Sequence, residues 1–285
     1  MTINVTNLTK TAGRHDRLHD LNLTIQPGMI YGLLGRNGAG KSTLLNIMAN
    51  RVLPSQGKVT IDGQALAQSD RTLQHLYLMS EDNLYPSRER VSDLFKLTTA
   101  LYGSFDDKLA ERLAKAFDLD VNARFGGLST GYRTIFKDIV ALCVPADYIL
   151  LDEPVLGLDA SHRDLFYQSL IETYAQHPRT FVIATHLIEE ISGLLNQVIV
   201  MDQGRILVAE AAEDLLARSY QLSGPKETMA AFLPTVTTLR THQFGKQTQA
   251  VVTTAGTLDL PAGVTKEALD LQQLFVALTE DHHEV

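Results

Sequence analysis

The pattern of apolar and polar positions predicts an α/β fold in which buried strands alternate with helices. Apolar runs at residues 29–34, 148–151 and 180–184 are typical of strands covered on both faces of a parallel sheet. Residues 42–50, which follow a glycine-rich segment after the first of these strands, carry apolar side chains at helical spacing. Further strands are expected at 197–202 and 205–209, and further helices at 91–101, 108–117 and 133–144.

A glycine-rich segment between the first strand and its helix fits the phosphate-loop pattern G-x-x-x-x-G-K-[ST]. Its glycines let successive backbone N–H groups point at phosphates, while Lys41 and the helix N-terminus add positive charge. The Ser42 hydroxyl can hold Mg²⁺. A glycine-rich turn with nothing bound is the alternative, and the flanking strand and helix disfavour it. The predicted ATP-binding residues are Gly35, Arg36, Asn37, Gly38, Ala39, Gly40, Lys41, Ser42 and Thr43.

A second candidate for phosphate chemistry lies where the strand at 148–151 ends in Asp152-Glu153-Pro154. Carboxylates at the C-terminal edge of a doubly wound sheet lie at the mouth of the nucleotide crevice. Asp152 is therefore the predicted Mg²⁺ ligand, and Glu153 is the predicted base that orients and deprotonates the attacking water. A strand that simply ends in a polar turn is the alternative, and the phosphate loop upstream favours the catalytic interpretation.

Composition narrows the class of protein. The 285 residues are 45% hydrophobic with a formal net charge of −8, which suits a globular enzyme and argues against a general nucleic-acid binder. The single cysteine, Cys143, excludes an internal disulfide and a multi-cysteine metal site, and its apolar surroundings predict a core position. No apolar stretch reaches the roughly 18 residues of a membrane span, and no secretory signal is visible. A cytoplasmic location is expected.

Three further motifs follow in a fixed order. They are Leu128-Ser129-Thr130-Gly131-Tyr132 before a helix, Gly157-Leu158-Asp159 after the carboxylates, and an apolar strand that ends at His186. Each is weak alone, because Ser129 could simply cap a helix and a histidine after a strand is usually structural. Together with the phosphate loop, they give residues 1–218 a close resemblance to the ATP-binding subunits of ABC transporters.

The resemblance implies roles for the remaining candidate residues. In that family two nucleotide-binding domains face each other head to tail, and each ATP lies between one phosphate loop and the partner's signature motif. Ser129 and Gly131 would then contact the partner subunit's ATP. Asp159, in the D-loop, would link the two sites, and His186 would hold the γ-phosphate or the water. A homodimer or a heterodimer with a second ATP-binding subunit is expected, with ATP and Mg²⁺ as cofactors.

The chain departs from the family pattern in three places. Thr130 and Tyr132 replace a glycine and a glutamine of the signature. The aromatic residue that stacks on adenine in the family is missing, because Ala12 aligns with its position. His15 is the candidate substitute. The Q-loop glutamine is also absent, and Ser80 or, next best, Glu81 stands at its position. Either could still ligate Mg²⁺, directly or through water.

Domain organisation is predicted as an ABC ATP-binding domain at 1–218, with a helical subdomain at about 87–145, and a small α+β accessory domain at 219–285. The core combines a parallel sheet with an edge antiparallel β-region. Strands in the accessory domain are expected at 219–224, 249–252 and 258–260, with helices at 227–232 and 271–278. This layout resembles the C-terminal extension of ATPases that serve ABC-2-type multidrug or bacteriocin exporters of Gram-positive bacteria. The signature and the carboxylate segment resemble those of a cell-envelope-stress system.

Two functions remain open. In the first, the chain is an ATPase that energises a separate transmembrane permease subunit, an exporter, from the inner face of the cell membrane. In the second, it is an ABC ATPase that remodels a protein or ribonucleoprotein partner without a membrane subunit. The single ATPase domain, the lack of a coiled-coil insertion and the C-terminal extension favour the first. No nucleic-acid partner is expected.

Overall fold

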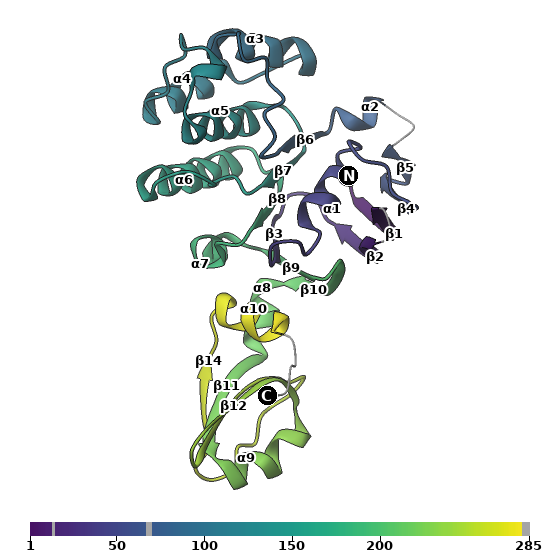
Figure 1. Cartoon of the computed structure of the whole chain (residues 1–285), viewed down its shortest axis with the longest axis vertical. Helices are drawn as coiled ribbons and strands as arrows, with labels where there is room; N and C mark the ends of the chain where they lie inside the picture. The colour runs from purple at the N-terminus through teal and green to yellow at the C-terminus, as the bar shows by residue number, and fades with distance from the viewer. Residues whose placement is uncertain (13–14, 67–69, 281–285) are drawn as a thin grey trace.

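The computed structural model describes residues 1–12, 15–66 and 70–280. A six-stranded sheet lies at its centre (Figure 1). The strand order is β10-β9-β3-β8-β7-β6, with all neighbours parallel except the antiparallel edge strand β10. The strands are β3 (Ile30–Gly35), β6 (Leu76–Met79), β7 (Tyr148–Asp152), β8 (Thr180–Thr185), β9 (Gln197–Asp202) and β10 (Arg205–Ala211). Every residue of β3, β7 and β8 is buried, as their apolar runs predict.

Helices cover both faces of this sheet. On one face, α1 (Lys41–Met48) packs its leucines against Tyr31 and Leu33 of β3 in a shared apolar cluster. On the other face, α5 (Thr130–Cys143) and α6 (Ala160–Gln176) join Ile30 and Leu34 in a second cluster. Cys143 is buried in that second cluster, which confirms its predicted core position.

An antiparallel sheet flanks the phosphate-loop side of the molecule, in the order β2-β1-β4-β5 (Figure 1). Its strands are β1 (Ile3–Ala12), β2 (His15–Ile25), β4 (Gln56–Ile61) and β5 (Gln64–Ala65), and α2 (Asp70–Leu73) leads back to β6. On the opposite side, α3 (Val91–Tyr102) and α4 (Asp107–Ala116) form a helical layer with α5. Asp106 caps α4 through its carboxylate, which accepts from the Leu109 N–H at 2.9 Å.

The C-terminal region has its own sheet, ordered β12-β13-β11-β14, below the core in Figure 1. Its elements are β11 (Ser219–Pro225), α9 (Lys226–Phe232), β12 (Thr237–Phe244), β13 (Gln247–Thr253), β14 (Thr265–Ala268) and α10 (Leu271–Thr279). α8 (Ala212–Ala217) leads into it, and α7 (Ile188–Ile191) lies above α10. The predicted strand at 258–260 is wrong: these residues have no regular structure, and the fourth strand is β14.

The last helix joins this region to the core. Leu271, Leu274 and Phe275 of α10 belong to the same buried cluster as Ile188 and Leu195. A capping box at Asp270 and Gln273 fixes where α10 begins. The division of the chain at residue 218 stays a prediction. In the described residues, no helix combines the length and the apolar character that crossing a bilayer requires.

Candidate nucleotide site

The phosphate loop joins the end of β3 to the start of α1. Gly40 has a φ of 106°, and a Cβ there would lie 2.7 Å from the Leu18 side chain, so this turn requires glycine. The Lys41 ammonium donates to the Gly35 carbonyl at 2.7 Å and lies 3.9 Å from Glu153 Oε1. Burial lowers the pKa of Lys41, and the Glu153 and Asp152 charges oppose that effect. The lysine is thus held at the mouth of the loop beside the carboxylates.

Asp152 lies at the end of β7 and faces α1. Its carboxylate accepts a hydrogen bond of 3.1 Å from the Ser42 hydroxyl. Burial raises the pKa of Asp152, and the Ser42 hydrogen bond offsets part of the rise. A hydroxyl and a carboxylate are oxygen donors of the kind that Mg²⁺ prefers. The structure therefore brings together the two residues predicted to hold the metal.

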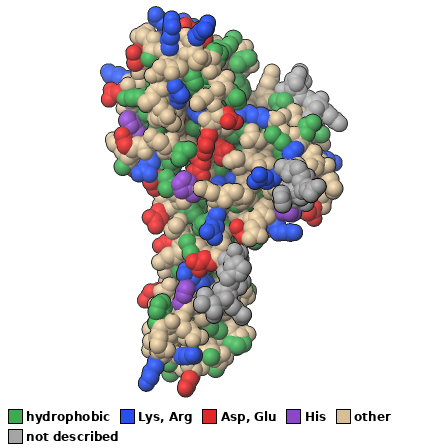
Figure 2. Space-filling model, viewed as in Figure 1, with side chains coloured by type: hydrophobic (Ala, Val, Ile, Leu, Met, Phe, Trp, Pro, Cys, Tyr) green, Lys and Arg blue, Asp and Glu red, His purple; other side chains and the backbone are tan. Residues whose placement is uncertain are grey.

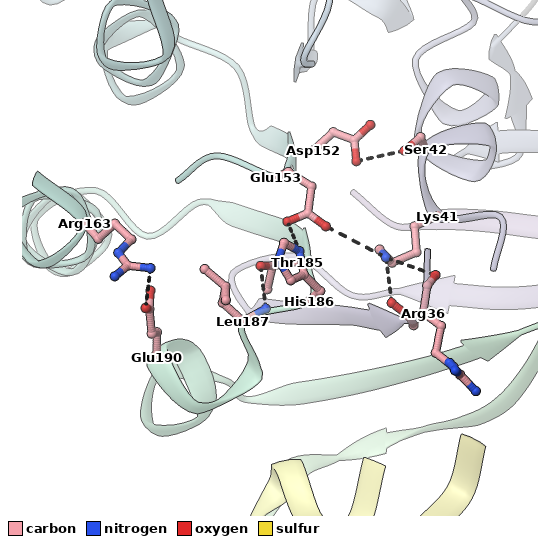
Figure 3. Close-up of polar contacts among 11 residues, drawn as sticks. Arg36, Lys41, Ser42, Asp152, Glu153, Arg163, Thr185, His186, Leu187 and Glu190 are labelled. Atoms are coloured by element: carbon pink, nitrogen blue, oxygen red, sulfur yellow. Dashed lines mark hydrogen bonds and ion pairs between the residues drawn. The ribbon is translucent and has the colours of Figure 1, made fainter. Parts of the chain in front are cut away.

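Glu153 lies between two positive or ionisable groups from other elements (Figure 3). Besides Lys41, its Oε2 lies 3.0 Å from His186 Nδ1. The backbone holds it there, because the Glu153 N–H donates to the Ala184 carbonyl at 2.8 Å. Its φ of 50° is a left-handed conformation that costs energy for a residue with a Cβ and is typical of functional sites. The adjacent parallel strands β7 and β8 bring Glu153 and His186 together.

Ser129 and Gly131, the signature residues expected to contact ATP, lie at the N-terminus of α5 in the helical layer. Ser129 caps α5 by accepting from the Tyr132 N–H at 3.3 Å and is exposed. A Cβ on Gly131 would lie 2.9 Å from the Gly157 carbonyl, so the signature packs closely on the D-loop segment. These contacts stay within α5 and that segment.

Asp159 caps α6 in the same neighbourhood. Its carboxylate accepts from the His162 N–H at 2.9 Å and lies 3.2 Å from His162 Nδ1. The His162 backbone hydrogen bond is the main cause that lowers the pKa of Asp159. The ring of Tyr132, which stands where the family has glutamine, lies 6.3 Å from the His162 ring. Signature and D-loop therefore share a contact through His162.

Ser80 and Glu81, at the Q-loop position, follow β6. Ser80 is buried, and its hydroxyl accepts from Arg51 Nη1 at 3.0 Å. The Ser80 and Glu81 carbonyls accept from Lys137 Nζ at 2.8 and 3.0 Å. The sequence interpretation missed both Arg51 and Lys137. A signal was present, because Lys137 and Asp138 interrupt an otherwise apolar stretch of α5.

Ala12 and His15, the residues predicted for the adenine-stacking position, are the last residue of β1 and the first residue of β2. Their backbones pair with each other. Their side chains lie outside the described part of the chain, so their role toward adenine stays a prediction.

Comparison with known proteins agrees with this geometry. The domain family described as "ABC transporter" matches residues 18–156. The ABC transporter ATP-binding protein NatA of Bacillus subtilis (strain 168) is 32% identical over 206 residues, which are 70% of this chain and 83% of NatA. YtrB of the same organism, also named an ABC transporter ATP-binding protein, is 28% identical over 196 residues, 69% of this chain and 67% of YtrB.

A solved structure, that of an ATP-binding subunit of an ABC transporter, shares the fold. It superposes with a TM-score of 0.68 at 21% identity, over 76% of this chain and 92% of the other. The sequence similarity to NatA extends well beyond the motifs, over most of both chains. The chain therefore belongs to the ABC transporter family, as one of its ATP-binding ATPase subunits.

Proposed function

We propose that the chain hydrolyses Mg²⁺-bound ATP with Glu153 as the general base and that turnover energises a separate transmembrane subunit. The observation that carries this proposal is the position of Glu153, which lies 3.9 Å from Lys41 Nζ and 3.0 Å from His186 Nδ1. Three separate segments of chain supply these groups, and they meet at the C-terminal edge of the central sheet.

Each group has a defined task in phosphoryl transfer. The phosphate-loop N–H groups and Lys41 bind the phosphates, and Lys41 neutralises negative charge on the γ-phosphate. Ser42 and Asp152 would hold Mg²⁺, which supplies charge neutralisation between the phosphates when bound. Glu153 accepts the proton of the attacking water, and His186 orients the Glu153 carboxylate and the water. Hydrolysis then yields ADP and phosphate.

A second ATP-binding subunit completes the site in this proposal. Ser129 and the Gly131 backbone lie at an exposed helix N-terminus, which suits an anion, yet they contact α5 and the D-loop segment. Head-to-tail pairing would bring them to the γ-phosphate held by the other subunit. The partner is either a second copy of this chain or a sibling ATPase.

Docking to a membrane subunit is supported by exposed leucines near the Q-loop. Leu84, Leu97 and Leu101 are 66%, 43% and 70% exposed, and the last two lie on α3. Figure 2 shows hydrophobic side chains on the surface of this helical end of the molecule. Leu97 and Leu101 are one turn apart on α3 and so form a joint exposed apolar surface, which is typical of an interaction site. The chain would thus lie at the inner face of the membrane through its partner.

The direction of transport is proposed to be export. Relatives named for Nod factor export and for ribose import are both similar to this chain, so the names alone do not decide the direction. Export is favoured by the resemblance of the C-terminal sequence to the extension of exporter ATPases, and this region of the structure has strands and a closing helix.

The decisive experiment measures ATP turnover and ATP binding in the Glu153→Gln variant. We expect ATP binding to remain and turnover to fall by roughly 10²–10⁴-fold, the usual contribution of a general base. Glu213→Gln, which changes an exposed glutamate of α8, is the matched control and should keep full turnover. Near-normal turnover in Glu153→Gln would reject Glu153 as the base.

The membrane partner is tested by purifying the tagged chain from detergent-solubilised membranes of its own host. A stoichiometric multi-span protein supports the transporter function. Recovery only from the aqueous fraction, with a protein or ribonucleoprotein partner, would favour the remodelling ATPase instead.

A further inference from the structure

We propose that the buried Lys137 ammonium joins the Q-loop to the signature helix α5 and so positions the Q-loop for ATP turnover. This inference rests on the proposed ATPase function. Lys137 donates to the Ser80 and Glu81 carbonyls and not to the phosphate loop, Ser42 or Asp152, so it is a positioning residue that acts through the Q-loop backbone. The chain has Ser80 where the family has glutamine, and Lys137 holds the backbone of that residue.

Lys137 is an unusual residue for its place. Its side chain is buried, and its Nζ donates to the carbonyls of Ser80 and Glu81 at 2.8 and 3.0 Å. Burying an ammonium costs free energy unless it is hydrogen-bonded and near opposite charge. Burial lowers the pKa of Lys137, while the charges of Asp138, Glu81 and Asp82 raise it and that of Arg133 lowers it. The two carbonyls and the acidic neighbours therefore fix the ammonium in this position.

A second tie joins the far end of the Q-loop to the same helix. The ring of Tyr85 packs edge-on against Phe136 with centroids 4.8 Å apart. The Tyr85 hydroxyl also lies 2.8 Å from the Tyr77 hydroxyl of β6. Phe136 and Lys137 are consecutive on α5, so residues 80–85 are held at both ends by one turn of this helix. The loop and the signature helix must then move together.

Arg51 ties the same loop to the phosphate-loop helix. It follows α1, and its guanidinium donates to Ser80 Oγ at 3.0 Å and to the Leu78 carbonyl at 2.8 Å. Ser80 therefore lies between Arg51 and Lys137, with one hydrogen bond to its hydroxyl and one to its carbonyl. A continuous path of contacts runs from the end of α1 through Ser80 to α5, which begins at the signature.

The Q-loop also forms one wall of a space that reaches the proposed base. A small cavity of about 120 Å³ lies between the loop and α5. Its lining includes Glu81, Thr130, Lys137 and Glu153. A shift of the Q-loop would change the surroundings of Glu153 without touching the phosphate loop. Loss of the Lys137 hydrogen bonds should therefore lower kcat and leave ATP binding nearly unchanged.

The test compares Lys137→Met, Lys137→Arg and the control Lys108→Met, which removes an exposed lysine from α4 of the same helical layer. For each variant, kcat, KM, ATP affinity and amide hydrogen exchange of residues 78–85 are measured. We expect Lys137→Met to lower kcat by about 10- to 100-fold, the size of a misplaced catalytic group, with KM and ATP affinity within about twofold. Hydrogen exchange in residues 80–85 should be faster in Lys137→Met. Lys137→Arg should restore part of the kcat and part of the protection from exchange.

Two results would overturn the proposal. One is unchanged kcat and unchanged exchange in Lys137→Met. The other is a general loss of ATP affinity and thermal stability that Lys137→Arg does not restore, which indicates only a structural lysine. Lys137→Gln, which keeps an N–H donor without the charge, is the second variant if Lys137→Met does not fold, and the same criteria apply. Hydrogen exchange does not depend on turnover, so failure of Glu153 as the base would be distinguished from failure of the Lys137 link.

Discussion

The Ser42 hydroxyl donates a 3.1 Å hydrogen bond to Asp152 across 110 positions of sequence. Ser42 lies in the first turn of α1 and Asp152 is the last residue of β7, so the bond joins the start of the helix to the end of the strand. Both side chains offer oxygen atoms to the same point beside the phosphate loop. A divalent cation placed there would exchange this hydrogen bond for two ligand bonds, which links metal affinity to both residues.

Replacing Asp152 by asparagine is expected to remove most of the Mg²⁺ dependence of ATP binding. The amide cannot supply the negative charge that a divalent cation needs, whereas the phosphate-loop contacts remain. Titration of a fluorescent ATP analogue with and without EDTA measures this dependence. Asp164→Asn, an exposed aspartate of α6, serves as the control and should bind like the native chain in both buffers. Undiminished Mg²⁺ dependence in Asp152→Asn would exclude Asp152 as a ligand.

His186 is expected to act through Glu153, since the two side chains lie 3.0 Å apart. His186→Ala should lower kcat by at least about tenfold and leave ATP binding in place. Because both residues serve one proton transfer, their effects should not add. A double-mutant cycle with Glu153→Gln measures the coupling, and the double variant should be no slower than Glu153→Gln alone. Fully additive losses would show that His186 has a separate role.

Gly131 and Gly127 offer a matched pair for testing how tightly the signature packs on the D-loop segment. A Cβ at Gly131 would lie 2.9 Å from the Gly157 carbonyl, while a Cβ at Gly127 would meet no atom of the described residues within 4 Å. Gly131→Ala should therefore destabilise the fold by about 1–3 kcal/mol, the usual cost of overpacking. Gly127→Ala should be close to neutral. Urea unfolding of the two variants measures the difference. Equal midpoints would mean that the D-loop segment shifts to accept the added methyl group at no cost in stability.

Asp138 makes the stability of the chain depend on pH. Both of its carboxylate oxygens are buried and have no hydrogen-bond partner among the described residues, and burial raises its pKa well above the ordinary value, with Lys137 opposing. The folded state therefore retains a proton that the unfolded state loses above about pH 4. Stability falls as pH rises from there through the raised pKa.

Asp138→Asn, which stays neutral, should lack this decline. The free energy of unfolding of Asp138→Asn minus that of the native chain should increase between pH 5 and pH 8. The expected increase is about 1 kcal/mol or more. Urea unfolding at the two pH values measures the difference. Asp118→Asn, an exposed aspartate, controls for charge removal. A difference between native chain and Asp138→Asn that does not change with pH would mean that Asp138 does not titrate in this range.

The nucleotide-binding half of the fold could be predicted because its signals are local. The phosphate loop needs glycines, a lysine and a hydroxyl within nine consecutive residues, and a buried strand needs only an apolar run. The strands at 148–151 and 180–184 and the helix at 91–101 are confirmed by β7, β8 and α3. The proximity of Glu153 and His186 follows from adjacent strand ends, which the fold class already implies.

The C-terminal sheet and the Q-loop contacts could not be predicted in this way. Residues 258–260 alternate like a strand, yet the edge strand that pairs with β11 on the side away from β13 is β14, whose residues 265–268 are exposed and largely polar. Such a strand is selected by its neighbour, not by its own pattern. Likewise, Lys137 looks like an error in an apolar helix until the Ser80 and Glu81 carbonyls are seen beside it.

The packing of α10 has a consequence for how the chain comes to be folded during synthesis. Leu274 and Phe275 lie in one buried apolar cluster with core residues that include Ile188 of α7 and Leu195, and α10 contacts both α7 and β3. Domains generally fold from the N-terminal side as they leave the ribosome. The nucleotide-binding part must therefore wait with this patch open until residues 271–279 emerge. If synthesis stops within the segment that encodes the C-terminal sheet, the released chain has every phosphate-binding residue. It still exposes an apolar surface that chaperones can bind.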